Sequence, residues 1–118
     1  MSRFADRIRP FVDAELRAAE AGGPDAFRHL ERAHILGQES TREHVRVHWR
    51  MLRWGLARGD MREVFGQFFR LIGAATKTFA GLVPTGNTGG ANVSPFEPMP
   101  IEPELADIIR KARDGAPD

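Results

Sequence analysis

The chain has 118 residues, of which 42% are hydrophobic and 28% are charged, and its formal net charge at pH 7 is +1. These values are typical of a single soluble globular domain, and the near-neutral charge argues against a dedicated nucleic-acid-binding module. The apolar runs are far shorter than the roughly 20 residues that cross a bilayer, and zero cysteines exclude disulfides and thiolate metal sites. Because the start of the chain, "MSRFADRIRPF", lacks the apolar core of a secretory signal, we expect a cytoplasmic protein without a membrane span.

Four helices are predicted in the first 80 residues, because apolar residues recur with helical spacing between clear breaks. Gly22 and Gly23 end the first helix, and Gly59 ends the third. Ser40 and Glu43 fit a capping box, with Ser at the N-cap and Glu three residues later. The expected ranges are about Ser2 to Ala21, Pro24 to Gly37, Ser40 to Arg58 and Met61 to Ala80.

Short connections between these segments favour antiparallel neighbours, and no segment has the alternating pattern of a strand. The segments "DAFRHLERAHIL" and "DMREVFGQFFRL" also resemble each other at a spacing of 35 residues, close to the tetratricopeptide period. We therefore expect an all-α fold of four main helices arranged as antiparallel hairpins, either a bundle or a tetratricopeptide-like stack.

The segment "PTGNTGGANVSPF" contains no charged side chain, and apolar residues flank it on both sides. Glycine and asparagine allow tight turns and close backbone approach. We expect residues 81–102 to form an ordered strap over the 1–80 helical core, anchored by Leu82, Val83, Phe96 and Met99. A short terminal helix is expected at 103–113, with proline in its first turn.

Three polar residues fall inside the apolar arcs of the predicted helices. Glu15 lies in the middle of the apolar face of the first helix, and His44 and His48 lie at the centre of the apolar arc of the third. Burying such groups costs free energy unless each has a partner. These residues are therefore candidates for a buried site.

A metal site would satisfy these residues together. His44 and His48 are separated by four residues, which places two imidazoles on one helix face. The turn after Gly37 brings His34 towards His44, and Glu31 precedes His34 in a Glu-x-x-His motif. Imidazole and carboxylate ligands without sulfur suit Zn, Fe, Mn or Cu. The predicted ligands are His34, His44, His48, Glu15 and Glu31.

Secondary candidates are Glu63, Gln67 and His29. Glu63 and Gln67 face away from the apolar stripe of the fourth helix, which is formed by Val64, Phe65, Phe68 and Leu71. His29 lies at the rim of its apolar face, which suggests a structural role. The sequence leaves open whether the chain is an enzyme, although an open position on the ion would permit hydrolytic or redox chemistry.

A helical-hairpin module that binds a protein or peptide without metal is the alternative function. It would use the neutral segment or the arginine stripe of the third helix, formed by Arg42, Arg46, Arg50 and Arg53. The interpretation of the arginine stripe without a binding function is an ordinary charged helix face in contact with solvent. A homodimer that buries the apolar fourth helix is a third hypothesis.

The segments "HLERAHILGQ", "HVRVHWRML" and "ATKTFAGLVPTGNTGGANVSPFEPMPIEPEL" resemble the bacterial domain-of-unknown-function 3703 family. The resemblance extends from about Phe11 to Ile109. It implies a small, single-domain bacterial protein with an ordered C-terminal signature. The family has no assigned activity, so the resemblance carries over no catalytic residues.

Overall fold

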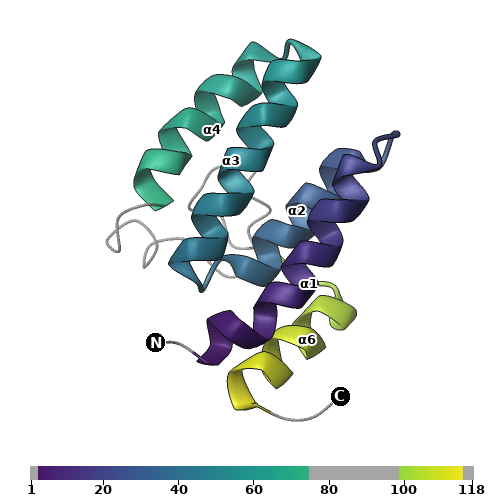
Figure 1. Cartoon of the computed structure of the whole chain (residues 1–118), viewed down its shortest axis with the longest axis vertical. Coiled ribbons are helices and arrows are strands. Elements are labelled where there is room, and N and C mark those ends of the chain that lie inside the picture. The colour runs from purple at the N-terminus through teal and green to yellow at the C-terminus, as the bar shows by residue number, and fades with distance from the viewer. Residues whose placement is uncertain (1–2, 75–98, 116–118) are drawn as a thin grey trace.

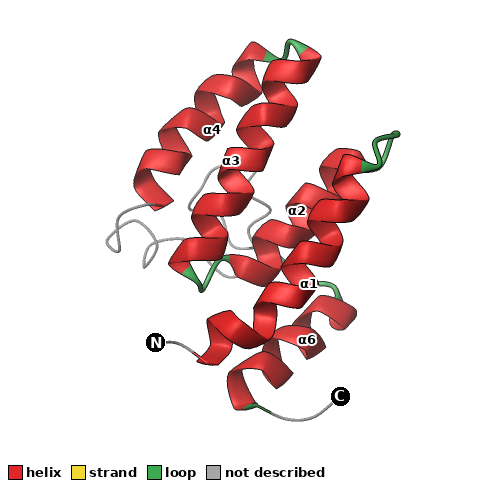
Figure 2. Cartoon of the chain, in the orientation of Figure 1, coloured by secondary structure: helices red, strands yellow, loops and turns green. Residues whose placement is uncertain are grey.

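The computed structural model describes residues 3–74 and 99–115, and every regular element in these two ranges is an α-helix (Figure 2). The all-α fold predicted from the sequence is therefore confirmed. The helices are α1 (Arg3–Glu20), α2 (Ala26–Gly37), α3 (Thr41–Arg58), α4 (Met61–Ala74) and α6 (Pro103–Asp114).

The helix ends follow local chain chemistry. Gly59 has a φ of 69°, the left-handed conformation that glycine adopts without strain, and it closes α3. At the other end of α3, the Ser40 hydroxyl accepts a hydrogen bond from the Glu43 backbone amide at 3.4 Å. The Glu43 side chain departs from the capping-box pattern, because its carboxylate accepts hydrogen bonds from Arg46.

The helices form two antiparallel hairpins, as the short connections predict (Figure 1). The first is α1 with α2, and the second is α3 with α4. The two hairpins meet mainly where α2 packs against α3, and α6 lies against α1 and α2. The site described below lies at this meeting of α2, α3 and α4.

The hydrophobic core lies mainly between α1, α2, α3 and α6. Ile8, Val12 and Leu16 follow one another at intervals of four residues, so they form one buried stripe along α1. Leu105 and Ile109 bring α6 into the same core. The terminal helix is thus part of the fold. The remaining members of the core cluster are Leu30, Ala33, Ile35, Leu36, Val47, Met51 and Ala112.

Charged groups add a second attachment for α6. The Arg32 guanidinium on α2 binds Glu102 at 2.9 Å and also binds Glu104. Arg7 donates from Nε to the Ala112 carbonyl oxygen at 2.7 Å, near the C-terminus of α6. Ion pairs from Arg32 therefore reinforce the apolar packing of α6.

The orientation of α4 differs from the sequence-based expectation. Glu63, Gln67 and Arg70 are buried, whereas Phe65 and Phe68 are 67% and 56% exposed. The α3–α4 contact runs along the Val64 side of α4, where a Cβ atom added to Gly55 would lie 3.1 Å from Val64. Glu63 and Gln67 border this contact, so the polar side of the helix is covered and part of the predicted apolar stripe is not.

The predicted strap falls almost entirely on residues 75–98, which lie outside the described residues. The same holds for the predicted continuation of the fourth helix to Ala80. Met99, one of the expected anchors, is described and is partly buried. Among the described helices, none has both the length and the apolar character required to cross a membrane.

Candidate metal centre

Three histidines converge where the two hairpins meet. His34 lies in the last turn of α2, and His44 and His48 lie in the first two turns of α3. All three are buried, with exposed fractions of 1%, 0% and 1%. We call them the three-histidine cluster. The predicted approach of His34 to His44 across the α2–α3 turn is confirmed.

The ring nitrogens that face one another have the spacing of metal ligands. The His44 Nε2 atom lies 3.2 Å from Nε2 of His34 and 3.0 Å from Nε2 of His48. Nitrogen ligands at the usual Zn–N distance occupy tetrahedron corners about 3.3 Å apart. The ligand nitrogens of all three rings lie within 4.8 Å of one another, so one ion between them is within reach of each ring after the side chains adjust.

Neighbouring polar groups determine which nitrogen of His48 carries the proton. The Glu63 carboxylate accepts a hydrogen bond from the Gln67 amide nitrogen, so the Gln67 amide oxygen faces His48. That oxygen can only accept, and His48 therefore donates from Nδ1. The Nε2 atom of neutral His48 is left with a free lone pair directed into the three-histidine cluster. This is the tautomer that a metal ligand requires.

Burial keeps the histidines of α3 neutral. Desolvation lowers the pKa of His44 to about 4. Desolvation, and to a smaller degree the neighbouring His44, lowers the pKa of His48 to about 3. At neutral pH both rings therefore have a lone pair available for a metal, and proton competition is weak.

At these distances the three facing Nε2 atoms cannot all be joined to one another by hydrogen bonds. If His44 carries its proton on Nε2, it can donate that proton well to only one of its two neighbours. If it carries the proton on Nδ1, two lone pairs face each other between His44 and His48. A cation among the rings would remove this conflict, because each Nε2 atom could then donate its lone pair.

The support around the three-histidine cluster is uneven. His48 is held by Gln67, whereas the Nδ1 atom of His44 has no hydrogen-bond partner among the described residues. Loss of the His48 support should therefore affect the cluster strongly.

Two carboxylates flank the three-histidine cluster without joining it. Glu63 is buried and accepts a hydrogen bond from Gln67. It also lies near the Arg70 guanidinium. Burial lowers the pKa of Arg70, and the negative charge of Glu63 partly opposes this decrease. Glu31 is partly buried, and desolvation raises the pKa of its carboxyl group against the influence of Arg28, with Glu63 adding to the rise. Glu63 on α4 is thus close enough to Glu31 on α2 to raise the pKa of the Glu31 carboxyl group.

The structure places Glu15 in a different cluster from the one the sequence predicted. Its carboxylate lies 2.8 Å from the His29 Nδ1 atom and 3.0 Å from the Arg32 Nε atom. Among the described residues, the group with metal-ligand spacing comprises His34, His44 and His48, without Glu15 or Glu31. Arg32 and His29 supply the partners that a core-facing glutamate needs, so no metal is required to explain Glu15.

Gln67 and Glu63 were secondary candidates in the sequence, yet they hold the best-defined contact to the three-histidine cluster. The sequence makes them secondary candidates because its apolar stripe predicts that the fourth helix buries its phenylalanines. The signal that points to them is the spacing of Glu63, Gln67 and Arg70, which forms a polar stripe along one side of an otherwise apolar helix.

Comparison with models of known protein families identifies the family of the chain. The family model described as "Protein of unknown function (DUF3703)" matches residues 6–109, which is most of the chain. The chain belongs to this family. The match includes all three members of the cluster, and the description of DUF3703 assigns no activity to them. No curated protein and no solved structure matches the chain.

Proposed function

We propose that this member of DUF3703 binds one transition-metal ion through the Nε2 atoms of His34, His44 and His48. The observation that carries the proposal is the approach of three buried Nε2 atoms, at 3.0 and 3.2 Å for the two His44 pairs. Burial and the orientation of His48 by Gln67 support it, because both leave nitrogen lone pairs available for an ion.

The donor set favours a particular class of ion. Neutral imidazoles suit Zn, Cu, Fe and Ni, whereas Mg, Ca and Mn prefer oxygen ligands. The two nearby carboxylates, Glu31 and Glu63, lie outside the group of three. Zinc is therefore the first ion to test, with Cu(II) and Fe(II) next, and Mn is less favoured than the sequence suggested.

Three protein ligands leave one position of a tetrahedral ion for water or another small ligand. An ion held in this way lowers the pKa of a bound water, which is the basis of hydrolytic zinc chemistry. Metal binding is the function proposed here, and a hydrolytic activity would be a consequence of that open position.

Metal analysis of the untagged protein tests the proposal. We expect protein purified without a polyhistidine tag to contain about one transition-metal ion per chain. After chelation, titration with Co(II) should produce the visible absorption of a tetrahedral Co(II) centre. His44→Ala and His48→Ala should each lower affinity by more than the roughly tenfold to hundredfold loss typical of residues outside the ligand set.

His29→Ala is the matched control, since His29 is the fourth histidine and pairs with Glu15 away from the three-histidine cluster. It should bind metal like the parent protein. Circular dichroism must show that all three variants keep their helices. Unchanged Co(II) affinity in folded His48→Ala protein would refute the proposed ligand set.

Self-association through α4 is the second candidate. Its exposed face consists of Phe65, Phe68, Phe69 and Ile72, which are 56% to 76% exposed. Contiguous exposed apolar residues commonly mark interaction surfaces. A homodimer would bury two copies of this face against each other, and it is compatible with a metal centre on the buried side of the helix.

A further inference from the structure

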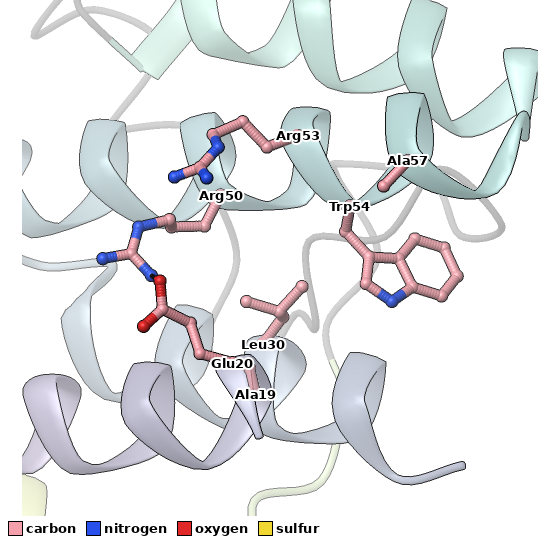
Figure 3. Close-up of a pocket in the computed structure, with 7 residues that line it drawn as sticks. All are labelled: Ala19, Glu20, Leu30, Arg50, Arg53, Trp54 and Ala57. Carbon is pink, nitrogen blue, oxygen red and sulfur yellow. Dashed lines mark hydrogen bonds and ion pairs between the residues drawn. The ribbon is translucent and has the colours of Figure 1, made fainter. Parts of the chain in front are cut away.

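A cleft separate from the three-histidine cluster lies between α1, α2 and α3 (Figure 3). Its volume is about 190 Å³. An apolar cavity of about 150 Å³ can hold benzene, so this cleft has room for a small ring or a short branched chain. Leu30, Ala19 and Trp54 supply its apolar surface.

Positive charge is concentrated at one end of the cleft. Figure 3 shows the guanidinium groups of Arg50 and Arg53 at that end, with the Trp54 indole at the other. Arg53 is exposed and has no ion-pair partner among the described residues. Arg50 has one carboxylate partner, Glu20, at 3.3 Å. Two cations therefore meet one acidic group.

The Glu20–Arg50 pair indicates what the charged end accepts. The Glu20 side chain is 62% exposed, so its ion pair with Arg50 contributes little stability and can exchange with another carboxylate. Guanidinium groups bind carboxylates through parallel hydrogen bonds, and two neighbouring arginines strengthen this preference.

The apolar end is held rigid by its neighbours. The Trp54 ring packs on Phe27 with a centroid distance of 4.5 Å, and Arg58 lies over the Trp54 ring at 5.1 Å. A preformed apolar wall reduces the entropy that a ligand must lose on binding. Charge at one end and a fixed aromatic wall at the other define an amphipathic site.

We propose that this cleft binds a small monocarboxylate with an aromatic or branched apolar body. The carboxylate lies against Arg53 and Arg50, where it displaces Glu20, and the apolar body packs on Trp54 and Leu30. The lining residues include no member of the three-histidine cluster. The proposal is therefore independent of metal binding and would survive its failure.

Calorimetric titration with 3-phenylpropionate tests the proposal, with 3-phenylpropionamide as the neutral comparison. For a ligand of this size we expect a dissociation constant on the order of 0.1–1 mM. The amide should bind at least about tenfold more weakly, because it cannot form charge-assisted hydrogen bonds with the arginines.

Variants separate the two ends of the cleft. Arg53→Gln should weaken 3-phenylpropionate binding about tenfold, and Glu20→Gln should strengthen it, because the competing carboxylate is removed. Ala57→Trp, at an exposed lining position, should block the apolar end. Arg42→Gln, an exposed arginine of α3 outside the cleft, should leave binding unchanged.

Equal binding of acid and amide, or an unchanged affinity in Arg53→Gln, would overturn the proposal. So would absence of binding at millimolar 3-phenylpropionate in the folded parent protein. Metal content measured in the same samples should stay constant across all four variants. Loss of metal from any of them would show that the two sites are coupled.

Discussion

At the scale of single residues, the polarity of the hydrogen bonds around His48 determines the chemistry. Glu63 orients the Gln67 amide, the amide oxygen requires a proton on His48 Nδ1, and Nε2 is left unprotonated. The roles of Glu63, Gln67 and His48 depend on one another, because each hydrogen bond sets the direction of the next.

Gln67→Leu removes the acceptor that holds His48 while keeping a side chain of similar size. We expect the variant to bind metal about tenfold to hundredfold more weakly, the usual effect of losing a hydrogen bond to a ligand histidine. Competition between the protein and a chromophoric chelator measures the change. Arg62→Gln, an exposed neighbour on α4, is the control. Parent-like affinity in Gln67→Leu would show that Gln67 does not orient His48.

Acid should destabilise the metal-free protein. In the unfolded chain His44 and His48 take up protons near pH 6.5, whereas in the folded protein their pKa values are about 4 and about 3. The unfolded state therefore binds more protons as the pH falls below 6.5, so the free energy of unfolding decreases over the range from 6.5 to about 4. At about 1.4 kcal/mol per pKa unit, the loss between pH 6.5 and pH 5 is on the order of 4 kcal/mol for the pair.

Urea denaturation of chelator-treated protein at pH 7, 6 and 5 measures this slope. The double variant His44→Leu, His48→Leu lacks both titrating groups and should show a clearly smaller dependence on pH. Equal slopes for the two proteins would mean that other groups cause the acid sensitivity.

At the scale of helices, the close approach of α2 and α3 sets the position of the three-histidine cluster. A Cβ atom at Gly37 would lie 2.8 Å from the Glu43 Cβ atom and 3.4 Å from Val12. Gly37 is thus the position where the last turn of α2 meets the first turn of α3, next to His34 and His44. Only glycine permits this approach without a shift of the helices.

Gly37→Ala should therefore affect both the fold and the site. We expect a loss of about 1–3 kcal/mol in the free energy of unfolding, typical of an overpacked contact, together with weaker metal binding as His34 moves relative to His44. Urea denaturation measures the loss of stability, and Co(II) titration measures the loss of metal affinity. Both losses should be larger in Gly37→Ser than in Gly37→Ala. A variant with parent stability would show that the contact relaxes freely.

At the scale of the whole molecule, the exposed phenylalanines of α4 favour self-association. We expect the parent protein to sediment as a dimer at micromolar concentration, and Phe68→Asp to shift it to the monomer, because a buried unpaired charge opposes docking of apolar surfaces. Metal binding should be unaffected, since Phe68 is exposed and its side chain points about 100° around α4 from the buried Gln67. A monomeric parent protein across the same concentrations would exclude the dimer.

The sequence by itself determined the helices, most of their ends, the burial of His44 and His48, and the approach of His34 to His44. These features depend on local signals, namely glycine breaks, a serine N-cap and a period of 3.6 residues, and a short turn makes neighbours of residues at equal distances from it. For this reason both the helical fold and the three-histidine cluster could be anticipated.

Tertiary structure decided which side of α4 is covered and which groups pair with Glu15. An apolar stripe predicts that a helix has a buried side, but the packing of neighbouring helices determines which side that is. Likewise, a core-facing carboxylate needs a partner, and helix packing brought Arg32 and His29 to Glu15 while it brought Gln67 to His48. Such pairings join distant parts of the chain, so no local pattern encodes them.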